Sequence, residues 1–272
     1  MSGLKKRPLG KTGLMVTELG LGAMDTPESS EGTQTLETAL DAGINFIDTA
    51  RDYAGSEFLI GQVVRARGRK DFHIATKTFS HSSDGSQRDV DRSLSILGVE
   101  RIDLYQLHDI STAEAWEQVM QEDGALAGLQ IAKYRGLIDH IGVSSHSLDI
   151  LHRAITCGEF STVMLEYSAF FPDTATLIDL AAEMGVGVIV MRPLGGSGRT
   201  SVMRGRIAEG YAGELTPANL LRYVLSHPGV STAIPGARYP SRIHENATVA
   251  SAYRPMDATT RHRLEDEAGR LY

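Results

Sequence analysis

Residues 72–108, FHIATKTFSHSSDGSQRDVDRSLSILGVERIDLYQLH, contain one complete strand–helix–strand unit. Two short apolar runs, Phe72–Lys77 and Ile102–His108, enclose a longer amphipathic stretch, Ser86–Leu97. The apolar runs are nearly continuous rather than alternating, which is typical of parallel strands buried on both faces. The pattern therefore predicts a βαβ unit in a parallel sheet.

The same alternation extends in both directions along the chain. The other predicted strands are Leu19–Met24, Asn45–Thr49, His140–Ser144, Thr162–Tyr167, Val186–Met191 and Ser231–Ile234. The other predicted helices are Glu31–Ala42, Ser56–Ala66, Ala113–Lys133, Leu148–Cys157, Asp173–Glu183, Pro217–Ser226 and Ser241–Ser251. Strands and helices that alternate in this way, eight of each, predict an α/β fold of the (β/α)8 TIM-barrel type.

Three further features complete the predicted architecture. The stretches Arg7–Leu9 and Met15–Glu18 flank a glycine-rich turn, which predicts an N-terminal β-hairpin that closes the bottom of the barrel. An extra helix is expected at Asp257–Gly269, and the glycine-rich stretch Leu194–Gly213 is expected to be the loosest loop. No low-complexity linker interrupts the chain, so we expect residues 1–272 to form a single domain.

Composition narrows the possible partners. The chain has 27 Lys and Arg against 34 Asp and Glu, a net charge of -7, without a concentrated basic stretch, so nucleic acid is not an expected partner. A single cysteine, Cys157, excludes an intrachain disulfide and a Cys-rich zinc site, and favours a reducing cytoplasm. No apolar run reaches the roughly 18 residues of a membrane span, and no signal peptide or metal-ligand spacing is found. We expect a cytoplasmic protein without a metal or a membrane partner.

Polar residues at the ends of three successive predicted strands are the candidates for chemistry. Asp48, Lys77 and His108 end these strands, and Tyr53 follows Asp48 by five residues. Because the active sites of α/β barrels lie at the carboxyl ends of the strands, these side chains are expected to meet in one mouth. Each of them taken alone is more often an ordinary loop residue.

The four residue types together suit proton transfer. A phenol has an ordinary pKa of about 10 and exchanges protons near neutral pH only if a nearby cation favours the phenolate. Lys77 fits the role of that cation, and Asp48 fits the role of its counterion. A neutral His108 imidazole could hold a carbonyl oxygen by a hydrogen bond beside Tyr53.

Several motifs resemble those of the aldo-keto reductases. They are Asn45-Phe-Ile-Asp-Thr-Ala50, Tyr53-Ala-Gly-Ser-Glu57, Ile74-Ala-Thr-Lys77 and Asp103-Leu-Tyr-Gln-Leu-His108, and the resemblance extends from Leu9 to Asn246. It implies a barrel with an opening hairpin and a nicotinamide dinucleotide, usually NADPH, bound without a Rossmann domain. It also implies that Asp48, Tyr53, Lys77 and His108 form a catalytic tetrad in which Tyr53 is the general acid of carbonyl reduction.

The resemblance further implies a set of cofactor contacts. They are Ser144, Ser145, Met164, Met191, Pro193, Leu194, Gly196, Pro235, Gly236, Arg238, Arg242, Glu245 and Asn246. The chain departs from the family at Met164, where Gln is common, at Met191, where many members have an aromatic ring, and at Gly236, where NADPH-preferring members often have Lys. Arg238 and Arg242 could still bind a 2'-phosphate, so NADP(H) is favoured and NAD is the alternative.

The substrate pocket is expected to be partly aromatic and open. Its expected residues are Met24, Asp25, Phe79, Asp109, Phe170 and Phe171. Asp109 stands where the family often has an apolar residue, and it either disfavours anionic substrates or faces solvent. The long C-terminal substrate loop of larger members is expected to be missing.

The predicted function is NADP-dependent reduction of small aldehyde or ketone substrates to alcohols. Two alternatives stay open. One is a cofactor-binding regulatory protein of the same fold with little turnover, and the other is NAD-dependent oxidation of alcohols or sugars.

Overall fold

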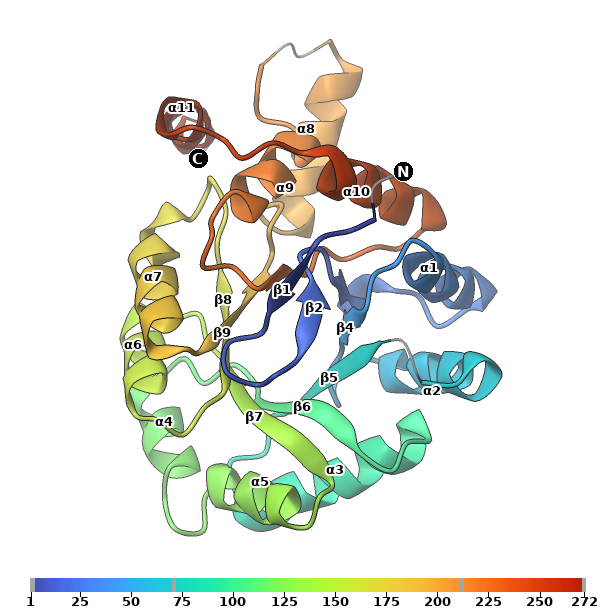
Figure 1. The fold of residues 1–272 in the computed structure, drawn as a ribbon, viewed down its shortest axis with the longest axis vertical. Coiled ribbons are helices and arrows are strands. Elements are labelled where there is room, and N and C mark those ends of the chain that lie inside the picture. Colours follow the sequence, from blue (N-terminus) through green and yellow to red (C-terminus); the bar gives the residue numbers. More distant parts are fainter. Residues whose placement is uncertain (1–2, 70–71, 211–212, 271–272) are drawn as a thin grey trace.

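The predicted parallel sheet closes into a barrel. The computed structural model describes residues 3–69, 72–210 and 213–270, and in it eight parallel strands follow the order β10-β9-β8-β7-β6-β5-β4-β3, with helices around them (Figure 1). The strands are β3 (Leu21–Gly22), β4 (Phe46–Asp48), β5 (His73–Thr78), β6 (Ile102–Leu107), β7 (Ile138–Ser144), β8 (Thr162–Glu166), β9 (Gly187–Met191) and β10 (Thr232–Ala233). The (β/α)8 barrel predicted from the sequence is confirmed.

The seam between β3 and β10 joins the first and last strands of the sheet. Two isolated parallel bridges, Leu19 to Ala233 and Gly22 to Gly236, connect them. A Cβ atom at Gly22 would lie 2.8 Å from the carbonyl oxygen of Ile234, so the missing side chain lets the two backbones approach. Both strands are shorter than predicted because regular pairing gives way to these single bridges.

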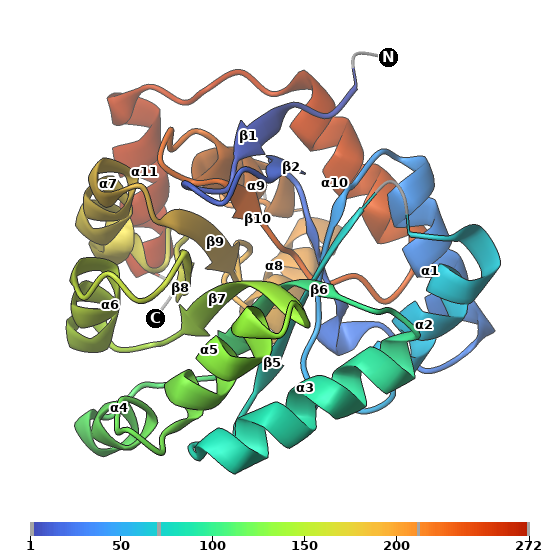
Figure 2. The same ribbon diagram turned by 60° about the horizontal axis from the view of Figure 1, so that its bottom comes forward.

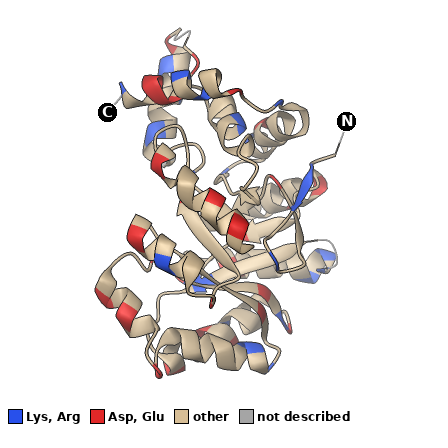
Figure 3. Ribbon diagram, turned by 60° about the vertical axis from the view of Figure 1, so that its left-hand side comes forward, with Lys and Arg blue, Asp and Glu red and all other residues tan. Residues whose placement is uncertain are grey.

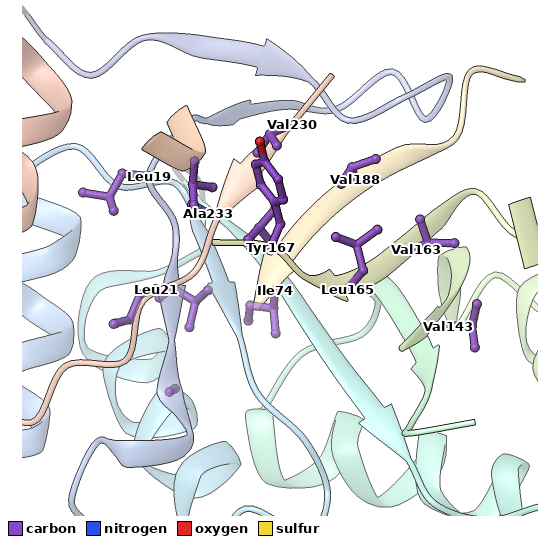
Figure 4. Packing of buried hydrophobic residues seen from close by; sticks show 14 of the residues in the cluster. Leu19, Leu21, Ile74, Val143, Val163, Leu165, Tyr167, Val188, Val230 and Ala233 are labelled. Carbon is purple, nitrogen blue, oxygen red and sulfur yellow. The ribbon is translucent and has the colours of Figure 1, made fainter. Parts of the chain in front are cut away.

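Successive residues of a strand point to opposite faces, and both faces are buried. Val163 and Leu165 of β8 and Val188 of β9 belong to the larger hydrophobic cluster, which also contains residues of the helices and is shown in part in Figure 4. Their neighbours Met164 and Ile189 belong to a smaller cluster inside the barrel. Burial on both sides explains why the strands are continuous apolar runs in the sequence.

The N-terminal hairpin closes one end of the barrel, as predicted. Strands β1 (Lys6–Pro8) and β2 (Met15–Thr17) pair in antiparallel fashion and lie across the barrel end (Figure 2). Gly10 in the turn has a φ of 55°, and a Cβ atom there would lie 2.3 Å from the backbone nitrogen of Gly187. Only glycine fits this contact between the hairpin and β9.

Arg7 ties the hairpin to a distant part of the chain. Its guanidinium donates hydrogen bonds to the carbonyl oxygens of Leu225, His227 and Val230 at 2.8, 2.9 and 2.6 Å. It also donates to Glu18 Oε1 at 2.7 Å. The first strand is therefore held by the segment that precedes β10.

The helices lie outside the sheet, and on the side shown in Figure 3 acidic and basic residues are interspersed along them. Their bounds are α1 (Ser30–Asp41), α2 (Ser56–Arg67), α3 (Ser83–Leu97), α4 (Ala113–Val119), α5 (Ala125–Tyr134), α6 (Leu148–Thr156), α7 (Ala175–Met184), α8 (Ser197–Ala208), α9 (Pro217–Leu225), α10 (Pro240–Ala252) and α11 (Ala258–Gly269). Short 3-10 turns occupy Ala23–Asp25 and Pro172–Thr174. The extra C-terminal helix is present as α11.

The prediction of one helix over Ala113–Lys133 is wrong. The chain forms α4 and α5 instead, with Gly124 as the N-cap of the second helix. Gly124 pairs with Ser82 in an isolated bridge, and a Cβ atom there would lie 2.5 Å from the carbonyl oxygen of Gln118. This close approach breaks the helix at the glycine.

The prediction of a loose loop over Leu194–Gly213 is also wrong, because residues 197–208 form α8. Gly195 and Gly196 have φ values of 81° and 87° and turn the chain from β9 into the helix. Residues 211–212 of this stretch lie outside the described residues. Residues 271–272 lie outside them as well, so the predicted absence of a long C-terminal substrate loop is not tested by the structure.

Candidate active site

The four candidate catalytic residues come together at the carboxyl ends of neighbouring strands. Asp48 ends β4, Lys77 lies near the end of β5, His108 follows β6, and Tyr53 is in the turn after β4. Asp48, Tyr53 and His108 line one cavity of about 830 Å³, and Lys77 is buried behind them. The strand-end rule therefore located a real cluster.

Asp48 and Lys77 form a buried ion pair. Lys77 Nζ donates to Asp48 Oδ2 at 2.6 Å and to the carbonyl oxygen of Thr49 at 2.8 Å, and it lies 3.5 Å from the Tyr53 hydroxyl. Gln106 Nε2 donates to the second oxygen of Asp48 at 3.1 Å. The relative exposure of Asp48 is 2% and that of Lys77 is 0%, so the pair needs these hydrogen bonds to offset desolvation.

Tyr53 keeps its proton. Burial raises the pKa of the Tyr53 phenol far above its ordinary value, the carboxylates of Asp48 and Asp52 raise it further, and Arg192 opposes them. The sequence-based expectation that a nearby cation brings this pKa close to neutral is not met in the resting site, because burial and these carboxylates dominate. At neutral pH the phenol is a hydrogen-bond donor.

His108 lies beside Tyr53 and is neutral at physiological pH. Its Nε2 is 3.5 Å from the Tyr53 hydroxyl, and its ring stacks on Phe79 with centroids 4.1 Å apart. Burial lowers the pKa of His108 to about 4, with Lys77 adding to the shift and Asp52 opposing it. The lowered pKa favours the neutral imidazole that the sequence predicts.

Most of the predicted cofactor residues border the same cavity. Those on its wall are Ser144, Met164, Met191, Pro193, Leu194, Gly196, Pro235, Gly236, Arg238, Arg242 and Asn246. Two predicted residues are not on the wall. Ser145 is buried and accepts a hydrogen bond from the Ser147 backbone, and Glu245 accepts hydrogen bonds from Arg242 and Arg204.

The predicted substrate pocket is partly corrected. Met24, Asp25, Phe79 and Asp109 are on the cavity wall, whereas Phe170 and Phe171 are not. Phe170 packs against Gly195 and lies under the guanidinium of Arg199, at 5.2 Å from its ring centroid. Residues of α8, among them Arg199, Thr200 and Arg204, line the cavity instead.

Sequence reasoning found Asp109 but missed other polar residues on the cavity wall, Arg192 and His146 among them. Arg192 and Asp109 have φ values of 49° and 53°, and they are the two non-glycine residues with positive φ in the described ranges. Both follow strand ends at the cavity, and backbone strain of this kind concentrates at functional sites. Arg192 pairs with Glu166, and His146 Nδ1 lies 3.6 Å from the same carboxylate. The strand-end rule could have found Arg192, which directly follows β9.

The cavity offers a dinucleotide a basic part and an apolar part. Arg204 of α8 and Arg242 of α10 both line it and share Glu245, so two guanidinium groups gather there. Guanidinium groups suit phosphate binding. Met164 and Met191 give the wall apolar surface close to Ser144. These residues fit a nicotinamide dinucleotide.

In the described ranges, no group of three or more His, Cys, Asp and Glu side chains is arranged to hold a metal ion. No helix in the same ranges is both long enough and apolar enough to cross a membrane.

Comparisons with known proteins identify the family of the chain. Residues 18–210 match the sequence profile of the Aldo/keto reductase family, and the chain belongs to this family of oxidoreductases, whose members use nicotinamide cofactors. The chain is 26% identical to the uncharacterized oxidoreductase YqkF of Bacillus subtilis over 92% of both proteins. It is 31% identical to the L-galactose dehydrogenase of Arabidopsis thaliana over 71% of this chain and 66% of the plant protein.

Solved structures share the fold. The holo form of an aldo-keto reductase from Bacillus halodurans gives a TM-score of 0.81 at 24% identity and covers 97% of this chain and 96% of its own. A thermostable aldo-keto reductase in complex with the inhibitor epalrestat gives a TM-score of 0.76 at 26% identity, covering 96% of this chain and 98% of its own. The family resemblance of the sequence motifs is thereby confirmed.

Proposed function

We propose that the protein reduces aldehyde or ketone carbonyls to alcohols with NADPH. The observation that carries this proposal is the position of the Tyr53 hydroxyl, which lies 3.5 Å from both Lys77 Nζ and His108 Nε2 on the cavity wall. A protonated phenol beside a buried cation suits a carbonyl oxygen that gains negative charge.

Each catalytic side chain has its own role in the proposed reaction. The hydride for the carbonyl carbon would come from a nicotinamide bound in the cavity. Tyr53 donates a hydrogen bond to the carbonyl oxygen and transfers its proton as the C=O double bond becomes a C–O single bond. Lys77, next to the hydroxyl, stabilises the phenolate left on Tyr53, and solvent returns the proton before the next turnover. Asp48 holds Lys77 in place.

A preference for NADPH is supported by the arginines. Arg242 donates to Glu245 at 2.7 Å, and Arg238 pairs with Asp25 at 3.5 Å. Each guanidinium has five N–H donors, so these contacts leave donors for a 2'-phosphate. We assign the phosphate to Arg242 and Arg238.

NAD-dependent oxidation of an alcohol or sugar is the second candidate. At Gly236 a Cβ atom would lie 3.1 Å from Asp25 Oδ2, so a carboxylate lies where many NADPH-binding relatives have a lysine. A carboxylate at this place favours a free ribose hydroxyl over a phosphate. One relative of the chain is named as a sugar dehydrogenase.

Cofactor binding separates these candidates. Fluorescence titration with NADPH and NADH is compared between the wild type and Arg242→Ala, with Arg153→Ala on α6 as the control. Loss of a charge-assisted hydrogen bond should weaken NADPH binding about 10- to 100-fold and leave NADH binding unchanged. An equal effect on both cofactors, or tighter binding of NADH by the wild type, would favour the NAD-dependent candidate.

Turnover tests the reductase itself. NADPH consumption is followed with aromatic aldehydes, diketones and sugars. Tyr53→Phe should lower kcat/KM by about 10²- to 10⁴-fold without weakening NADPH binding, because it removes the proton donor. Tyr134→Phe, which changes an exposed phenol on α5, should behave like the wild type. Undiminished turnover in Tyr53→Phe would refute the mechanism, and NADPH binding without turnover of any substrate would favour a regulatory protein.

A further inference from the structure

The Asp52 carboxylate contacts the His108 ring on the side away from Tyr53. Asp52 lies in the turn after β4, between Arg51, whose backbone N–H donates to the carbonyl oxygen of Lys77, and Tyr53, whose N–H donates to that of Ala50. This fixed backbone directs the Asp52 side chain across the site. Its Oδ1 lies 3.1 Å from His108 Nδ1.

The geometry determines where the proton of His108 resides. An ionised carboxylate only accepts hydrogen bonds, so Nδ1 must be the donor to Asp52. The ring is neutral near pH 7 because burial and Lys77 keep the pKa of His108 at about 4. A neutral imidazole has one N–H, and Nε2 is then an acceptor that faces the Tyr53 hydroxyl.

The other groups around the ring are compatible with this assignment. Lys77 of β5 faces it but directs Nζ to Asp48, Thr49 and Tyr53. The charge of Asp109, the next residue, acts on the ring and raises the pKa of His108 slightly, but the Asp109 side chain accepts its hydrogen bond from Ser111. Phe79 covers one face of the ring without a polar group.

We propose that Asp52 is a positioning residue that fixes His108 in the Nδ1-protonated tautomer, so that Nε2 accepts a hydrogen bond beside the donor Tyr53. This inference deepens the proposed function and reverses the expectation that His108 donates to the carbonyl oxygen. In the resting site Lys77 donates toward Tyr53, Tyr53 donates to Nε2, and Nδ1 donates to Asp52. A carbonyl oxygen then receives its hydrogen bond from Tyr53, whereas an alcohol hydroxyl can donate to Nε2.

The tautomer can be measured without cofactor or substrate. Long-range nitrogen–proton NMR correlations of the histidine rings distinguish Nδ1–H from Nε2–H, and His108→Gln identifies the signal among the nine histidines. We expect Nδ1–H in the wild type near neutral pH and a population shifted to Nε2–H in Asp52→Asn. Asp109→Asn removes a charge beside the same ring without removing this hydrogen bond, so it should keep Nδ1–H. Nε2–H in the wild type, or an unchanged tautomer in Asp52→Asn, would overturn the proposal.

Kinetics in both directions give a second readout, with benzaldehyde and benzyl alcohol as the probes. In Asp52→Asn the ring can present Nε2–H, so the KM of the aldehyde should fall and the KM of the alcohol should rise, each about threefold, as expected for one hydrogen bond gained and one lost. A residue with only a structural role would raise both KM values, and that result would contradict the proposal. If the wild type turns over neither these compounds nor any other substrate of the panel, the proposed function fails, while the NMR result still decides the role of Asp52.

Discussion

Replacing Lys77 by methionine tests the buried ion pair that supports Tyr53. Lys77 Nζ and Asp48 Oδ2 are 2.6 Å apart, and both side chains are excluded from solvent. Methionine fills most of the space of the lysine stem, so the substitution mainly removes the charge. Asp48 then keeps its hydrogen bond from Gln106 but has lost the cation beside it.

The size of the effect follows from two limits. Removing one partner of a buried ion pair costs about 3–5 kcal/mol. The carboxyl can escape this cost by taking up a proton, which at pH 7 requires about 4 kcal/mol for a group with an ordinary pKa of about 3.9. We therefore expect Lys77→Met to lower the free energy of unfolding by about 3–4 kcal/mol at pH 7.

The loss should depend on pH in a defined direction. Burial raises the pKa of the Asp48 carboxyl in the folded protein. Without Lys77 the folded variant binds more protons than the unfolded chain between the ordinary pKa and the raised one. Its stability therefore falls as pH rises through this window, by up to about 1.4 kcal/mol per pH unit.

Urea unfolding followed by circular dichroism at pH 5 and pH 7 measures both quantities. The double variant Asp48→Asn with Lys77→Met removes both charges and should recover most of the loss and show no pH dependence from this site. A loss below about 1 kcal/mol for Lys77→Met at pH 7, or a double variant as unstable as the single one, would refute the reasoning.

Substitutions at His108, Gly10 and Glu57 also have outcomes that follow from the structure, with Gly13→Ala as the control for Gly10. Burial lowers the pKa of His108 to about 4, so below about pH 6.5 the unfolded chain binds a proton that the folded protein does not bind. Between pH 6.5 and 4 the free energy of unfolding of the wild type should therefore fall by up to about 3 kcal/mol relative to that of His108→Gln. Urea titrations measure this difference, and parallel pH curves for the two proteins would contradict it. Gly10→Ala should cost more than about 3 kcal/mol in thermal melts because its Cβ meets Gly187, whereas Gly13→Ala, with positive φ but open space, should cost about 1 kcal/mol. Glu57→Ala removes the carboxylate that accepts hydrogen bonds from Arg51, Thr76 and Ser93, and it should lower the free energy of unfolding by about 3 kcal/mol. An unchanged free energy of unfolding would show that these hydrogen bonds contribute little.

The strands of the barrel were predictable because burial on both faces leaves a continuous apolar signal, as at Val163, Met164 and Leu165. The helices were predictable only where tertiary contacts agree with the local pattern. The break at Gly124 depends on a carbonyl oxygen six residues earlier, and the start of α8 depends on positive φ at the preceding glycines. Neither condition can be read from residue types alone.

The residues of the site, too, were predictable only in part. Asp48, Lys77 and His108 were found because a residue that ends a strand of a barrel must face the mouth. Asp52 was missed because its contact with His108 joins two loops, and the sequence does not state how two loops approach each other. The pKa of Tyr53 was misjudged for a similar reason, since the balance between burial and nearby charges exists only in the folded protein.

The hydrogen bonds of Arg7 have a consequence for biosynthesis. The carbonyl oxygens that its side chain reaches belong to residues 218, 220 and 223 positions further along the chain. During synthesis the hairpin therefore precedes these acceptors by more than 200 residues, and until they are made Arg7 has none of the three carbonyl oxygens to bind. A chain that stops before residue 225 lacks all three acceptors of Arg7, so its hairpin is not held by the hydrogen bonds that tie it to the segment before β10.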